Sequence, residues 1–167
     1  MNYTENKTSK NVILIVAVMT SFLTPFMGSS INIALPAIGS EFSMDAISLR
    51  WVVSAYLLAS AVFLLPIGRV ADIYGRKKIL LLGIIIFTVF SFLLAIATSS
   101  ALIIALRALQ GLGSAMIFGT GVAILTSAFP ARERGRALGI NVASVYLGLS
   151  LGPFLGGILT ESFGWRS

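Results

Sequence analysis

The sequence has one densely charged block between long apolar runs, residues 68–78. This block holds four cations and one carboxylate, that of Asp72. Its two glycines, Gly68 and Gly75, allow the backbone to turn sharply. Cations in a short segment between membrane helices fix the side of the membrane on which the segment lies. The residues of the block therefore predict a turn held on the inner side of a membrane.

A second charge, Arg107, lies well inside an apolar run. An arginine at mid-bilayer costs from a few to more than about 10 kcal/mol, so it persists where it faces protein or water. Gln110, Gly111 and Ser114 share its helical face at i+3, i+4 and i+7. We favour a functional role for Arg107, with extension of its side chain to the membrane surface as the alternative.

Small and polar residues form stripes on two other apolar runs. One stripe has Gly148, Gly152 and Gly156 at four-residue spacing, which lets a neighbouring backbone approach closely. The other is a polar stripe near the amino end that includes Gly28 and Asn32. For this second stripe we favour helix packing together with the lining of a wet cavity, over packing alone.

Several kinds of chemistry are excluded. The chain has no cysteine and no histidine, which excludes disulfides, thiolate or imidazole metal sites and a histidine base. It has neither GxxxxGK[ST] nor GxGxxG, so no ATP or dinucleotide cofactor is expected. No nucleophile–base pair can be assembled from the apolar runs, and an enzyme is not expected. The net charge of +6 comes from cations in loops beside apolar runs, which argues for membrane topology and against nucleic acid.

Composition predicts an all-α, polytopic protein in a lipid bilayer. The chain is 57% hydrophobic and 11% charged, with a mean hydropathy of +0.97. A cytoplasmic tail is expected at 1–11, followed by a five-helix transmembrane bundle over 12–159 and an external segment at 160–167. The expected spans are 12–33, 51–67, 79–97, 101–126 and 137–159. With the amino terminus in the cytoplasm, nine of the Lys and Arg residues lie inside and two outside, as expected for a multi-pass protein of the cell membrane.

Three motifs, in this order on these spans, resemble the major facilitator superfamily. Residues 68–78 are similar to its loop between helices two and three, and 107–113 to its helix-four RxxQGxG motif. Residues 148–157 are similar to its helix-five GxxxGPxxGG motif, found chiefly in antiporters. Residues 32–36 and 51–56 further resemble the fourteen-helix drug:proton antiporter branch, the EmrB/QacA type.

The resemblance implies a partial major facilitator fold and a role for each motif. It places a cytoplasmic gate at Gly68, Asp72, Gly75, Arg76 and Lys77. It places a central cavity at Asn32, Arg107, Gln110 and Gly111, where Arg107 assists proton coupling. It places the interface that rocks during transport at the helix-five motif, which comprises Gly148, Gly152, Pro153, Gly156 and Gly157. The implied activity is secondary transport, with proton-coupled efflux of small amphipathic, often cationic compounds.

Two departures from the family pattern limit these expectations. Met27 stands where this branch usually has an acid, and none of the five spans contains a carboxylate. An arginine does not deprotonate, so a proton carrier is expected outside this chain or at its rim. Family members have twelve or fourteen helices, so we expect an amino-terminal portion that needs the remaining helices of the transporter. The alternatives are a specific-metabolite transporter of the same superfamily and a truncated membrane protein that does not transport.

Overall fold

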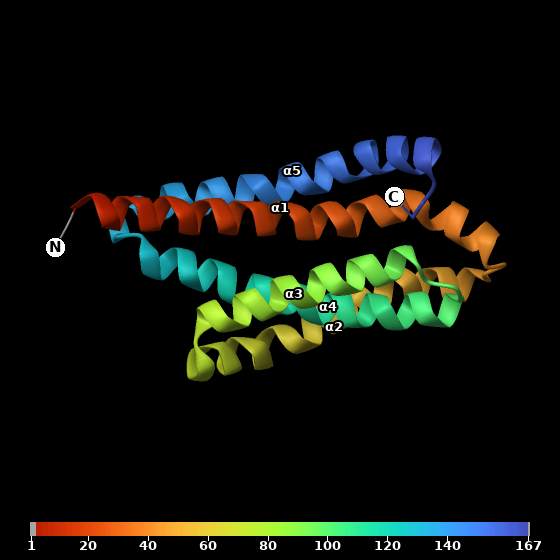
Figure 1. The fold of residues 1–167 in the computed structure, drawn as a ribbon, viewed down its shortest axis with the longest axis horizontal. Helices are drawn as coiled ribbons and strands as arrows, with labels where there is room; N and C mark the ends of the chain where they lie inside the picture. The colour runs from red at the N-terminus through yellow and green to blue at the C-terminus, as the bar shows by residue number, and fades with distance from the viewer. Residues whose placement is uncertain (1–2, 167) are drawn as a thin grey trace.

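The computed structural model describes residues 3–166, which form five helices (Figure 1). All five are long and apolar enough to cross a membrane, and the described residues contain no strand. The prediction of an all-α, multi-pass membrane protein is confirmed. The helices are α1 (Tyr3–Glu41), α2 (Ala46–Tyr74), α3 (Arg76–Ala95), α4 (Ser100–Ala128) and α5 (Ala131–Phe163).

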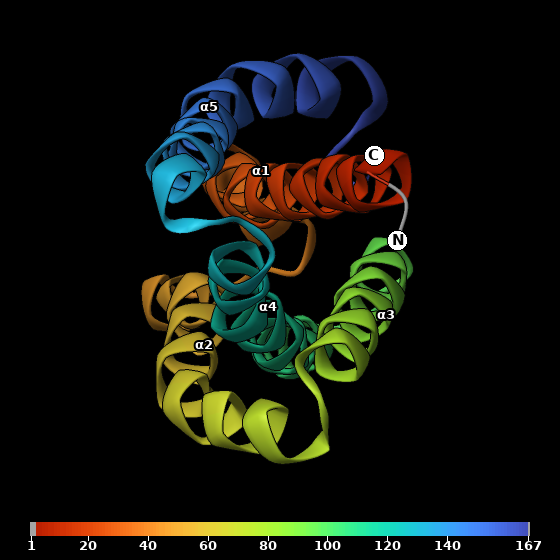
Figure 2. The same ribbon diagram turned by 90° about the vertical axis from the view of Figure 1, so that its left-hand side faces the viewer.

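Helix α4 is the centre of the bundle. Seen from one end, it lies between α2 and α3, while α1 and α5 form a pair on its other side (Figure 2). It is the most buried of the five helices. Its small residues, among them Gly111, Gly113 and Ser114, are buried and let neighbouring helices approach closely. The charged Arg107 therefore lies on the helix that has the most neighbours.

The helices extend beyond the spans expected from hydropathy. Residues 3–11, expected as a tail, continue α1. At its other end α1 continues past residue 33, the expected end of the first span, passes through Pro36 and ends at Glu41. A proline removes one helical hydrogen bond, but packing against neighbouring helices allows a membrane helix to continue through it.

The charged block 68–78 is mostly helical. Helix α2 ends at Tyr74 and α3 begins at Arg76, so Gly75 alone makes the turn. Gly75 has φ +103°, a conformation that side-chain-bearing residues rarely adopt, and its N–H donates to the carbonyl oxygen of Ala71. The expected loop is therefore a one-residue turn, and Gly68 lies inside α2. The connection between α4 and α5 is similarly short, because α5 begins directly after Pro130.

Helix α3 has one face packed in the bundle and one face exposed. Ile79, Leu80, Gly83 and Phe87 are buried, and Gly83 lies against Met116 of α4. Its other face is exposed, with Phe92 at 72%. Hydropathy does not reveal this division, because lipid-facing and helix-facing residues are equally apolar.

Candidate functional site

A polar network is enclosed around Arg107. This residue is 1% exposed, and its Nε donates to the carbonyl oxygen of Val52 on α2 at 3.1 Å. Its Nη1 donates to Oε1 of Gln110, one turn along α4. The amide nitrogen of Gln110 in turn donates to Oγ of Ser91 on α3, at 2.7 Å. One guanidinium thus links the three helices α2, α3 and α4.

Tyr56 on α2 covers the guanidinium. The Cζ of Arg107 lies 4.3 Å from the centre of the Tyr56 ring, within the range of a cation–π interaction. The Tyr56 hydroxyl donates to Oγ of Ser114 at 2.8 Å, and its side chain is buried. The sequence analysis did not predict this role for Tyr56. The available signal was its position one turn after Val52 on the same helical face.

The partners of Arg107 are all neutral. Its Nη2 is buried and has no hydrogen-bond partner among the described residues. No carboxylate of the described chain pairs with it, and Met27 instead packs in an apolar cluster with Tyr56, Leu80 and Phe87. A buried charge that lacks an opposite charge is costly in a membrane, which argues for a use beyond packing.

Gly111 brings α2 up to this network. A Cβ atom at Gly111 would collide with the carbonyl oxygen of Tyr56 and lie 3.0 Å from Cβ of Ala59. Ser60 of α2 donates to the Gly111 carbonyl oxygen at 3.0 Å. The close approach of the two backbones places Tyr56 over Arg107.

The structure joins three of the four residues predicted for a central cavity. Arg107, Gln110 and Gly111 lie together, enclosed between α2, α3 and α4. Asn32 is exposed on α1, and its one side-chain hydrogen bond is to the carbonyl oxygen of Gly28 at 3.5 Å. It takes no part in the Arg107 network.

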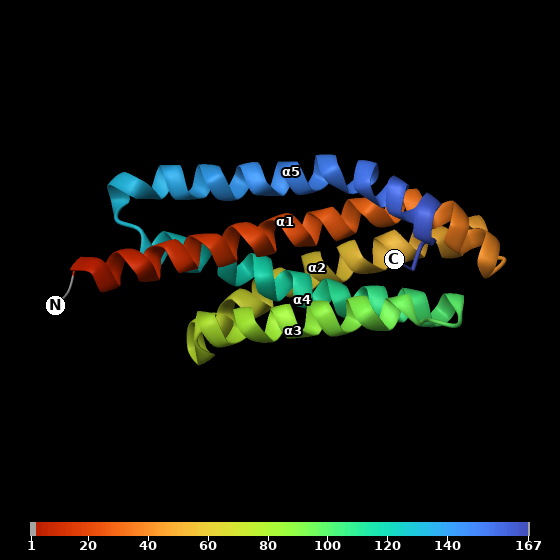
Figure 3. The same ribbon diagram turned by 45° about the horizontal axis from the view of Figure 1, so that its top comes forward.

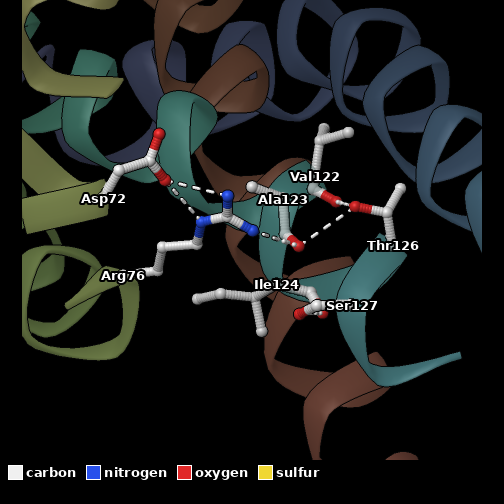
Figure 4. A network of polar contacts seen from close by, with 7 residues as sticks. All are labelled: Asp72, Arg76, Val122, Ala123, Ile124, Thr126 and Ser127. Atoms are coloured by element: carbon white, nitrogen blue, oxygen red, sulfur yellow. Dashed lines mark hydrogen bonds and ion pairs between the residues drawn. The ribbon is translucent and has the colours of Figure 1, made fainter. Parts of the chain in front are cut away.

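Asp72 and Arg76, two of the five residues predicted for the gate, meet near the α2–α3 turn (Figure 4). Arg76 pairs with Asp72, with Nε at 2.9 Å and Nη2 at 2.8 Å from Oδ1. Its Nη1 donates to the carbonyl oxygen of Ala123 on α4 at 3.2 Å. Arg76 therefore ties the turn to the central helix. Gly68 has open space beside it and Lys77 is exposed, so neither contributes to this contact.

The helix-five glycines form a seam with α1. A Cβ atom at Gly148 would collide with the carbonyl oxygen of Phe22, and one at Gly156 would lie 2.8 Å from Cβ of Ser30. Ser30 also donates to the Gly152 carbonyl oxygen at 2.9 Å. The seam is buried between α1 and α5, and its part in the rocking movement stays a prediction.

The two remaining residues of the helix-five motif lie beside the seam. Gly157 lies nearer to α1, since a Cβ atom there would be 3.7 Å from Ile33. Pro153 is on the exposed side of α5.

Three comparisons relate the chain to known proteins. The riboflavin transporter RibZ of Clostridioides difficile is 37% identical over 158 residues, which is 95% of this chain and 35% of that protein. The multidrug resistance protein Stp of Mycobacterium tuberculosis is 41% identical over 138 residues, covering 82% and 26%. The cephamycin export protein CmcT of Amycolatopsis lactamdurans is 39% identical over 165 residues, covering 98% and 34%. The chain thus spans about a third or less of the length of these relatives.

The fold of the chain also resembles that of a solved transporter. A bacterial homologue of the human lysosomal transporter Spinster, solved in an inward-facing, unoccupied conformation, superposes with a TM-score of 0.79 at 23% identity. The match covers 93% of this chain and 35% of that one, and it concerns the fold alone. The family description of the Major Facilitator Superfamily matches residues 17–167. The five-helix arrangement, the relatives and this match agree, and the chain belongs to the Major Facilitator Superfamily, a family of transporters and not of enzymes.

Proposed function

We propose that the chain is the amino-terminal part of a secondary transporter that exports small amphipathic compounds in exchange for protons. The observation that carries this proposal is Arg107, a cation enclosed in a network of neutral partners at the centre of the bundle. The relatives named for multidrug resistance and cephamycin export support the direction and the substrate class. The remaining helices of the transporter would complete the substrate pathway.

A second candidate is transport of one specific metabolite. The riboflavin transporter RibZ is 37% identical to the chain, so the relatives include a protein with a defined substrate. The described residues favour neither substrate class, because the Arg107 network is closed by its neighbours. A truncated protein that does not transport remains the third alternative, and it predicts that Arg107 matters only for stability.

A vesicle assay separates these candidates. Everted membrane vesicles that contain the native product should accumulate a fluorescent amphipathic cation when their interior is acidified, and a protonophore should stop the accumulation. Vesicles with an Arg107→Ala product are the matched control. Accumulation of riboflavin without that of the cation would support the second candidate, and a cation that does not accumulate would contradict the proposed efflux.

We also propose that the protein lies in the cell membrane with its amino terminus in the cytoplasm. The amino end, the α2–α3 turn and the α4–α5 turn lie at one end of the bundle (Figure 1). Exposed cations gather at the two turns, including Lys77 and Arg134, and cytoplasmic segments are enriched in such residues.

This orientation can be tested by thiol labelling, because the chain has no cysteine of its own. In intact cells, an impermeant maleimide should label Arg50→Cys on the outer end and should leave Lys77→Cys unlabelled until the membrane is opened. Both positions are exposed in the structure, so a difference in labelling reports the side of the membrane. The reverse pattern would invert the proposed topology.

The Asp72–Arg76 pair should matter for transport much more than for stability. Exposed ion pairs at i,i+4 contribute about 0.3–0.5 kcal/mol, and Asp72 is 56% exposed. Asp72→Asn should therefore leave membrane abundance near normal while it strongly reduces efflux, since the freed Arg76 no longer ties the turn to α4 in one position. Lys77→Gln, an exposed substitution next to the turn, is the control. Equal efflux by the two variants would remove the gate role from Asp72.

A further inference from the structure

A second polar cluster lies at the end of the bundle opposite the α2–α3 and α4–α5 turns, where the chain turns back after α5 (Figures 1 and 3). Glu41, the last residue of α1, accepts hydrogen bonds at Oε2 from Nε1 of Trp165 and from Nη1 of Arg166, both at 2.6 Å. Nη2 of Arg166 forms an ion pair with the other carboxylate oxygen. The carboxylate and the guanidinium therefore meet through both pairs of atoms, in the geometry of the stronger ion pairs.

The same cluster reaches the α3–α4 turn. Nη2 of Arg166 donates to the carbonyl oxygen of Ala97 at 3.2 Å. Ala97 is 1% exposed and belongs to an apolar cluster with Ile38 of α1 and Ile103 of α4, against which Trp165 packs. Arg166 thus connects three segments that are far apart in the sequence.

Two aromatic rings lie beside the arginine. Its Cζ lies 4.2 Å from the centre of the Trp165 ring and 5.8 Å from that of Phe42. The two rings meet edge to face, with centroids 6.0 Å apart. The hydrogen bond with Glu41 raises the pKa of Arg166, so the guanidinium stays charged. An exposed ion pair is usually weak, but two-atom geometry and aromatic contacts are the conditions under which it contributes.

The position of this cluster suggests its role. The α1–α5 pair and the group of α2, α3 and α4 meet mainly where α1 packs on α4. When a transporter changes conformation, forces on the α1–α5 pair can differ from those on the group of α2, α3 and α4. The contact between α1 and α4 must then resist the separation of the two groups. A contact that joins the end of α1, the segment after α5 and the α3–α4 turn would hold the two groups together.

We propose that Glu41, Phe42, Trp165 and Arg166 form an outer clasp that stays closed throughout the transport cycle, so that the five helices move as one unit. The existence of the closed clasp does not depend on the proposed function, because its contribution to stability can be measured on a protein that transports nothing. Its role during the cycle rests on the proposed function. Two experiments keep these parts distinguishable.

The first experiment is a double-mutant cycle on the thermal unfolding of the purified native product. Glu41→Gln and Arg166→Gln should each lower the unfolding midpoint. The midpoint of the double variant should be no lower than that of the less stable single variant, because both substitutions remove the same contact. Glu161→Gln and Arg50→Gln are the controls, since both are exposed and neither has a polar partner among the described residues; they should leave the midpoint unchanged. Additive losses from Glu41 and Arg166, or losses equal to those of the controls, would overturn the clasp.

The second experiment tests whether the clasp opens. The variant Phe42→Cys with Trp165→Cys places two thiols where the rings now meet, in a chain without other cysteines. After reaction with a short bifunctional thiol reagent, transport should equal that of the same variant before the reaction. Loss of transport that returns when a cleavable reagent is reduced would show that the clasp opens in each cycle, and it would overturn the proposal.

Discussion

Replacing Arg107 with alanine should abolish transport by the native product while its abundance in the membrane stays near normal. The guanidinium binds Val52 and Gln110 and lies over Tyr56, but no carboxylate among the described residues balances its charge. Removing a buried charge that lacks an opposite charge relieves its burial cost, which offsets the lost hydrogen bonds. A loss of activity in this variant would therefore come from the missing cation and not from unfolding.

Arg107→Lys and Arg107→Met refine this prediction. Lysine keeps the charge, but a single ammonium group lacks the planar fork that reaches Val52 and Gln110 together, so we expect weak residual transport. Methionine keeps much of the apolar volume without the charge and should resemble alanine in activity. Transport rates and membrane abundance should be measured for all three variants. If abundance falls in step with activity, or if methionine retains transport, the role of Arg107 is structural.

Gly148→Ala and Gly152→Ala should lower the free energy of unfolding by about 1–3 kcal/mol each, the usual cost of overpacking an interface. At Gly148 the new Cβ meets the carbonyl oxygen of Phe22, which belongs to the backbone and cannot rotate away. At Gly152 the nearest atom is Oγ of Ser29, which can rotate, but the carbonyl oxygen of Phe26 follows at 2.8 Å. The two helices must separate to admit either methyl group.

Gly139→Ala on the same helix is the matched control. A Cβ atom there meets nothing within 4 Å, and alanine is favoured over glycine in a helix by about 0.8–1 kcal/mol. This variant should be as stable as the parent or more stable. Its free energy of unfolding should therefore not fall, whereas that of Gly148→Ala and Gly152→Ala should. Thermal unfolding of the purified proteins measures the difference. If Gly148→Ala is as stable as Gly139→Ala, the α1–α5 seam is looser than the structure indicates.

The helical class and the order of the spans could be predicted from the sequence. Long apolar runs in a bilayer must satisfy their own backbone hydrogen bonds, and a helix does so within the run. The ends of the helices could not be predicted in this way. Polar residues such as those before Val12 and after Ile67 do not stop a helix, and only the turn at Gly75 separates α2 from α3.

Within the candidate site, the sequence determined which residues share a helical face. Periodicity placed Gln110 and Gly111 beside Arg107 and aligned Gly148 with Gly152 and Gly156. The tertiary structure decided which neighbour each face meets: Tyr56 and Ser91 for Arg107, and α1 for the glycines. It also joined Glu41 to Arg166, which lies 125 residues further along the chain. The physical reason is that the helical repeat fixes an angle around one axis, whereas pairing between helices depends on how all the surfaces pack together.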